Sequence, residues 1–215
     1  MKIHDAYLFI DWDTARRFRW ISSPLRQGRL VRAKPEQQLD EIYRMCAWTL
    51  KSLTKDRFRC QPRIYHGWHR GSTPTDDFRM LHGLQNSKSA HESTIFGQPL
   101  LSHELVCGTE FGSIRDTLRA REESPQEEQQ KMVDTALAAD LLFVARSATS
   151  RPGTRLLVLS EDDDMLPPVI IANHWGVDCH ILRTRPYNRH MPRHKRYIVL
   201  PQPPARDGED DEIDT

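Results

Sequence analysis

The chain has 215 residues, with 31 lysines and arginines against 30 aspartates and glutamates and 38% apolar residues. This size and balance are typical of one globular domain and exclude a wholly disordered chain. No run of about 18 apolar residues occurs, and the apolar run at residues 6–10 is too short for a signal-peptide core. We therefore expect a cytoplasmic protein with no membrane partner. The four cysteines lie far apart with no Cys-x-x-Cys spacing, which favours free thiols.

Charge is distributed unevenly along the chain. Residues 207–215 carry six acids and no base, so residues 1–206 have a net charge of +7. Together with the proline-rich residues 201–204, this acidic end predicts a disordered tail over residues 201–215, behind one folded domain of residues 1–200. Two basic stretches, residues 16–34 and 183–196, contain no acid and suit contact with phosphate groups.

Short apolar runs and helical spacing predict an alternation of strands and helices. In chain order, the expected strands lie at residues 6–10, 63–68, 156–159, 179–182 and, at an edge, 197–200. The expected helices lie at residues 36–53, 77–84, 127–145 and 167–175, with an extended segment at 100–107. This alternation predicts an α/β fold with a doubly wound, mostly parallel sheet and helices on both faces.

Acidic residues directly follow two of the predicted strands. Asp11 and Asp13 come after the first strand, and Asp162 and Asp164 come after residues 156–159. Because the carboxyl ends of parallel strands meet at one edge of a sheet, we expect these side chains to lie at the same edge.

Two further aspartates lie on the predicted helix of residues 127–145. Asp134 is near its start, and Asp140 interrupts its apolar face, where a charge requires a reason. Carboxylates that converge repel one another unless a hard divalent cation lies among them, and oxygen ligands suit Mg²⁺ or Mn²⁺. Such a cation would activate water for attack on a phosphodiester.

Three segments carry a resemblance to a known family. Residues Phe9–Thr14, Lys131–Leu142 and Val158–Met165 resemble, in order and spacing, the NYN domain of the PIN-like nuclease superfamily. In that family an aspartate ends the first strand, a Lys-x-Val-Asp segment opens an internal helix, and a Ser-Gly-Asp-x-Asp turn follows a later strand. The resemblance covers roughly residues 6–182.

The resemblance implies a metal-dependent nuclease that acts mostly on RNA, with a doubly wound sheet. Carried over position by position, it assigns catalysis and Mg²⁺ or Mn²⁺ binding to Asp11, Asp134, Asp162 and Asp164, with Asp140 as an auxiliary ligand. Glu161 is a further candidate ligand because it adds a carboxylate to the turn. Thr14 stands where the family often has Asn, and Glu161 replaces the Gly of the turn. An alternative is therefore an NYN-fold module that binds nucleic acid or protein through a degraded site.

Basic and aromatic residues supply candidate contacts to the nucleic acid, for which RNA is favoured over DNA. The basic candidates are Arg16, Arg17, Arg19, Lys131, Arg185, Arg189 and Arg193. Trp20 and Tyr187 are candidates for stacking on bases, whereas core packing is expected for Trp12 and Trp68. A second copy of the chain or a protein partner is compatible with this composition. The histidines are scattered, and we assign them no metal role.

A phosphatase of the haloacid dehalogenase type is a second alternative. Its first motif is Asp-x-Asp-x-Thr after a strand, and residues 11–15 supply the two aspartates but place Ala15 at the last position. In that mechanism Asp11 is a covalent nucleophile and Asp13 the general acid. Capture of an aspartyl-phosphate would distinguish this class from a nuclease.

Overall fold

The computed structural model describes residues 2–17, 25–26, 29–30, 34–71, 73–84, 89–102, 118–121, 128–130, 132–185 and 194–200. Several sequence-based predictions concern residues outside these ranges. The expected tail of residues 201–215 lies outside the described residues, as do Arg19, Trp20, Lys131, Tyr187, Arg189, Arg193 and the side chain of Arg17.

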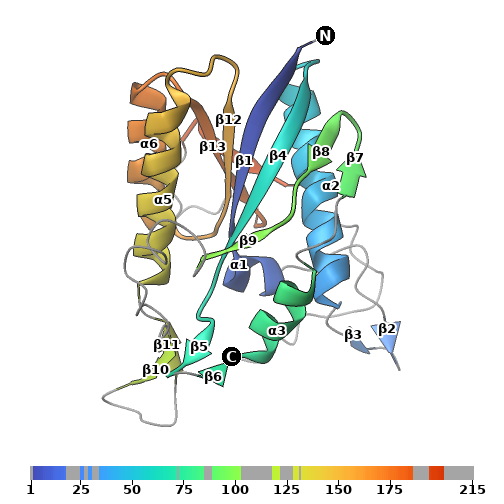
Figure 1. Ribbon diagram of the computed structural model, residues 1–215, viewed down its shortest axis with the longest axis vertical. Helices are drawn as coiled ribbons and strands as arrows, with labels where there is room; N and C mark the ends of the chain where they lie inside the picture. The colour runs from blue at the N-terminus through green and yellow to red at the C-terminus, as the bar shows by residue number, and fades with distance from the viewer. Residues whose placement is uncertain are drawn as a thin grey trace.

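The principal sheet has the strand order β14-β13-β12-β1-β4-β8-β7, and β9 also pairs with β4 (Figure 1). Its strands are β1 (Ile3–Asp11), β4 (Arg57–Tyr65), β7 (Ser89–His91), β8 (Thr94–Phe96), β9 (Leu100–Leu101), β12 (Arg155–Leu159), β13 (Asp178–Arg183) and β14 (Tyr197–Val199). Every neighbouring pair is parallel except β7 with β8. The chain therefore has an α/β fold with a mostly parallel mixed sheet, as the sequence predicted.

Helices lie on the two faces of this sheet (Figure 1). They are α1 (Trp12–Arg17), α2 (Pro35–Leu53), α3 (Asp76–Gly83), α5 (Val133–Ala148) and α6 (Leu166–His174), with a 3₁₀ turn, η2, at Asp163–Met165. Short strands form two smaller sheets from β2 (Leu25–Arg26) and β3 (Arg29–Leu30), and from β5 (His69–Arg70), β6 (Thr73–Pro74), β10 (Leu118–Ala120) and β11 (Glu128–Gln130).

Two apolar cores result from the alternation of side chains along the strands. On β1, Leu8 and Ile10 pack with α2, while Phe9 packs on the other face with α5 and α6. Trp12 and Trp68 are fully buried in the α2-side core, which confirms their expected packing role. Because both faces of β1 are buried, its carboxyl end is held firmly between β4 and β12.

Two predicted boundaries are wrong. The strand expected at residues 63–68 is β4, which ends at Tyr65 and begins at Arg57. Its first half alternates polar and apolar side chains, so a search for continuous apolar runs misses it. The helix expected from residue 127 begins at Val133, and residues 128–130 form β11, which pairs with β10.

The strand expected at residues 6–10 is β1, which begins three residues earlier, at Ile3. The remaining predicted elements are confirmed within a residue or two. The helix expected at 36–53 is α2, that at 77–84 is α3, and that at 167–175 is α6. Gly176 ends α6 with a φ of 85°, a conformation that glycine adopts without strain. Of the extended segment expected at 100–107, the described part forms β9. Within the described part of the chain, no helix is long and apolar enough to span a membrane.

Candidate metal centre

Asp11 lies at the carboxyl end of the central strand β1, where three groups bind its carboxylate. The Thr14 hydroxyl donates to Oδ2 at 2.6 Å, and the backbone N–H of Asp13 donates to Oδ1 at 3.0 Å. The Ser160 hydroxyl approaches Oδ2 at 3.4 Å from the end of β12. Burial raises the pKa of Asp11, the Thr14 hydrogen bond opposes that rise, and the charge of Asp13 adds to it.

Asp162 and Asp164 lie in the turn that follows β12, the strand next to β1. The backbone N–H of Asp162 donates to the Ser160 hydroxyl at 3.1 Å. Asp162 then caps η2, because its Oδ1 accepts from the backbone N–H of Asp164 at 2.8 Å. The same serine therefore contacts both Asp11 and the Asp162 turn, and it links the two strand ends.

Asp134 reaches this edge from the first turn of α5. Met132, the residue before the helix begins, has a left-handed φ of 63°, a conformation that is strained for a side chain of this size. The pKa of Asp134 is raised first by partial desolvation and then by the negative charges of Asp11, Asp162, Asp164 and Asp13. Asp11, Asp162 and Asp164 thus each act electrostatically on Asp134, although the four residues come from three distant segments.

These carboxylates are hard oxygen donors, the type that Mg²⁺ and Mn²⁺ prefer. Their mutual repulsion is the condition that a divalent cation relieves, so the donor set fits such an ion. Within the described part of the chain, however, no three His, Cys, Asp or Glu side chains already lie close enough together to hold a metal ion. Asp164 is exposed to solvent, and Asp134 is exposed but partly desolvated by its neighbours.

Glu161 points away from the aspartates. Its Oε1 accepts from the Thr184 hydroxyl at 2.6 Å and from the backbone N–H groups of Thr184 and Arg185. Arg183, which is 1% exposed, binds the Glu161 carbonyl and also Asp163. The structure therefore places the candidate ligand Glu161 in a clamp between the turn and the end of β13. Glu161 is not among the described residues with positive φ, so its backbone does not require the family's glycine.

Asp140 is not brought together with the other four aspartates. It is 1% exposed, and its Oδ2 accepts from the Tyr65 hydroxyl at 3.2 Å. Two turns of α5 separate it from Asp134, because six residues of helix rise by about 9 Å. The charge that interrupts the apolar face of α5 is thus held by a tyrosine from β4.

A polar cluster beside Asp13 was not predicted from the sequence. Arg16 contacts Asp13 at 2.8 Å and Asp77 at 3.2 Å, and Gln130 donates to Asp13. The buried His66 lies between the two carboxylates, with ring nitrogens 3.7 and 3.8 Å from Asp13 and Asp77. One signal was available: His66 directly follows β4, whose last residue is registered with Asp11. Asp13, the general acid of the phosphatase alternative, is thus held by Arg16 and Gln130.

Among the predicted nucleic-acid contacts, the side chains of Arg16 and Arg185 are described. Arg16 lies on α1, directly after β1, and the exposed Arg185 follows β13. Both therefore flank the edge that carries the aspartates.

Comparisons with protein-family models, with curated proteins and with solved structures give no match.

Proposed function

We propose that the chain is a metal-dependent nuclease that hydrolyses phosphodiester bonds, with RNA favoured over DNA. In this proposal, the fold is the doubly wound PIN-like arrangement of the NYN family, and residues 1–200 form one domain. The preference for RNA rests on the resemblance to that family.

One observation carries the proposal: Asp11, Asp162 and Asp164 each raise the pKa of Asp134, so four acids of the resembling motifs share one edge of the parallel sheet. A structural role would pair these carboxylates with cations. Instead, none of the four forms an ion pair with a described residue, and partial desolvation and the nearby acids raise the pKa of Asp134, an arrangement that a binding function explains. The exposed Arg185, which follows the end of β13, supplies positive charge for a phosphate backbone beside this edge.

In this mechanism, Asp11, Asp134, Asp162 and Asp164 would hold Mg²⁺ or Mn²⁺. When bound, such an ion supplies an activated water and neutralises charge on the phosphate. Thr14 and Ser160 fix the orientation of Asp11 through their hydroxyls. The clamp on Glu161 holds the turn that presents Asp162 and Asp164, so the ends of β1, β12 and β13 together position the ligands.

A cleavage assay tests the proposal. Labelled single-stranded RNA and DNA of one sequence are incubated with the protein in Mg²⁺, Mn²⁺ or EDTA. We expect cleavage with either metal, faster for RNA, and none in EDTA. Asp164→Asn should lose at least about a hundredfold in rate, because it removes a ligand charge. Asp40→Asn, a matched control on α2, should retain full activity. Absence of cleavage under every metal condition would overturn the proposal.

A second candidate is a non-catalytic module that binds nucleic acid through the same edge. The observation that favours it is that, among the described residues, no group of three metal-ligating side chains is already assembled. Binding of RNA that is unaffected by Mg²⁺, by EDTA and by Asp164→Asn, without cleavage, would favour this candidate over the nuclease.

A further inference from the structure

Strand β4 presents a row of arginines on one face of the sheet. Its burial alternates, with Phe58, Cys60 and Ile64 buried toward α2. The intervening positions therefore face the opposite side, and they are occupied by Arg57, Arg59, Gln61 and Arg63. We call Arg57, Arg59 and Arg63 the arginine row.

Part of this face is open. Helices α5 and α6 cover the part formed by β1, β12 and β13, through residues such as Phe9, Val158 and Ile181. Farther toward β8, the side chain of Arg59 is 71% exposed and Ile95 is 57% exposed. Within the described part of the chain, no helix packs over these two residues.

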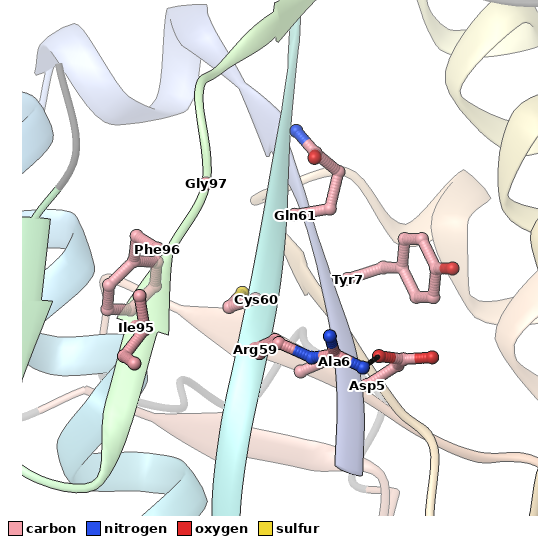
Figure 2. A pocket seen from close by; sticks show the side chains of 9 residues that line it. All are labelled: Asp5, Ala6, Tyr7, Arg59, Cys60, Gln61, Ile95, Phe96 and Gly97. Atoms are coloured by element: carbon pink, nitrogen blue, oxygen red, sulfur yellow. Dashed lines mark hydrogen bonds and ion pairs between the residues drawn. The ribbon is translucent and has the colours of Figure 1, made fainter. Parts of the chain in front are cut away.

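A hollow of about 360 Å³ lies on this open part, lined by residues of β1, β4 and β8. Figure 2 shows Arg59 and Gln61 on the central strand, with Asp5 and Tyr7 on one side and Ile95 on the other. The register sets Asp5 beside Arg59 and Tyr7 beside Gln61. The hollow thus combines a charged donor, an amide and a partly exposed aromatic ring.

Positive charge on this face exceeds what the described residues neutralise. Asp5 is shared by Arg59 at 3.5 Å and Arg151 at 3.4 Å. Arg57 and Arg63 form no ion pair with any described residue. Arg63 lies over the rings of Tyr7 and Phe9, and its Nε and Nη1 atoms are buried without a hydrogen-bond partner.

The arginine row leads to the candidate metal centre. Asp11 shares its face of β1 with Asp5, Tyr7 and Phe9, and Tyr65 at the end of β4 is registered with Asp11. Phe9 and Tyr65, which lie between the open part of the face and Asp11, are fully buried against α5, so only the part of the row before them is open. The direct span from Arg59 to Tyr65 is six strand residues, or about 20 Å. At no less than 3.4 Å per nucleotide, a single strand covers that distance with about six nucleotides or fewer.

We propose that the arginine row and the hollow beside it bind the phosphate backbone of single-stranded nucleic acid on its way to the aspartate edge. This inference rests on the proposed function, because it takes the aspartate edge as the place where the nucleic acid is cleaved. Charge complementarity selects a polyanion, and the ring of Tyr7 beside the row suits stacking of an unpaired base. The substrate class is therefore a single strand long enough to reach both regions.

The test compares two double variants that remove the same charge. Arg57→Gln/Arg59→Gln alters exposed positions of the row, and Arg44→Gln/Lys51→Gln alters exposed positions of α2 on the opposite side of the sheet. Binding of a 15-nucleotide RNA is measured against salt in Mg²⁺, with Asp11→Asn as the common background to prevent cleavage. Cleavage of a dinucleotide and of the 15-mer is measured in the active chain.

We expect the row variant to weaken binding of the 15-mer on the order of tenfold at 0.1 M salt. Its log–log salt slope should flatten by about 1.4, because each lost phosphate contact removes about 0.7 for a single strand. Cleavage of the 15-mer should show a raised KM with unchanged kcat, because the row binds at a distance from the reacting bond. Dinucleotide cleavage should not change, and Arg57→Lys/Arg59→Lys should restore the slope.

Three results would overturn the inference. These are an unchanged slope in the row variant, an equal loss in the α2 variant, and binding of poly-glutamate by the row with no binding of nucleic acid. A wild-type chain that cleaves nothing, while the row variant still loses 15-mer binding selectively, would overturn the proposed nuclease activity and support the row as a binding surface. Failure of the two proposals is therefore distinguishable.

Discussion

Two edges of one sheet use aspartate in opposite ways. At the carboxyl edge, Asp11 and Asp134 have raised pKa values because they are partly buried near other acids. At the start of β13, hydrogen bonding to His180, followed by the charges of His180, Arg155 and Arg196, lowers the pKa of Asp178 to about 2. Asp178 contacts His180 at 3.0 Å and Arg196 at 2.7 Å. The cationic partners of Asp178 join β12 to β13 through Arg155. Asp11 and Asp134, in contrast, form no ion pair with a described residue.

The largest expected effect is on cleavage activity, which should depend on Asp11 at the carboxyl edge and not on Asp178 at the opposite edge. Asp11→Asn should reduce metal-dependent cleavage by at least about a hundredfold, because it removes a charge from the ligand set. Asp178→Asn should leave kcat/KM within about twofold. Single-turnover cleavage and thermal unfolding are measured on both variants. Full activity in folded Asp11→Asn protein would contradict the assignment of Asp11 as a metal ligand.

Cation binding should stabilise the carboxyl edge. An ion that binds the folded chain alone, at a hundred times its Kd, adds about 2.7 kcal/mol, or roughly 5–10 °C in Tm for a chain of this size. Asp134→Asn should abolish most of that rise. It should also raise Tm slightly without the ion, because one repelling charge is gone. Differential scanning calorimetry with Mg²⁺, Mn²⁺ or EDTA measures Tm with and without the ion. An equal ion-induced rise in Tm in the variant would show that Asp134 is not a ligand.

Asp178→Asn should destabilise the fold by about 1–2 kcal/mol, since it leaves Arg155 and Arg196 without their shared carboxylate. The value is below that of a fully buried pair, because the Asp178 side chain is 28% exposed and solvent screens the interaction. Asp40→Asn is the control, since its ion pair is more exposed. Urea unfolding measures the free energy of unfolding of both variants. Equal losses in the two would contradict the structural role assigned to Asp178.

The smallest effect is on acid stability. The folded pKa of Asp178, about 2, lies below its ordinary value of 3.8. Its ionised form therefore stabilises the fold above pH 4, and this contribution is lost as the pH falls toward 2. Asp11 and Asp134 act in the opposite sense, because protonation relieves their repulsion. The wild type should thus lose about 1 kcal/mol more than Asp178→Asn between pH 4 and 2, measured by urea unfolding at each pH.

The sequence was sufficient for the main layout because its signals were local. The continuous apolar run at β1 and the periodic spacing of α2 each specify an element without distant information. Strand β4 was placed too late, since its polar face looks like a loop when read alone. The partner of β11 is β10, and no local pattern in its Glu- and Gln-rich residues indicates such a pairing.

The candidate site shows the same division. Asp11 and Asp164 could be proposed because each follows a strand, and the topology of parallel sheets places them at one edge. The orientation of Glu161 toward Thr184 depends on how β13 ends beside the turn. The hydrogen bond that holds Asp140 comes from Tyr65, 75 residues away in the sequence. Neither contact can be predicted from local sequence. The arginine row was hidden because its spacing of two has meaning only after β4 is recognised as a strand.

The central position of β1 has a consequence for how the molecule forms. This strand is the first along the chain, yet one of its neighbours, β12, lies about 150 residues later. Such non-local pairing slows folding, since a long loop must close before the contact forms. During synthesis, β1 must wait for β12 to emerge, and the Asp162 turn follows it. The acidic edge therefore cannot assemble on a partly made chain, and fragments ending before residue 155 should lack the activity altogether.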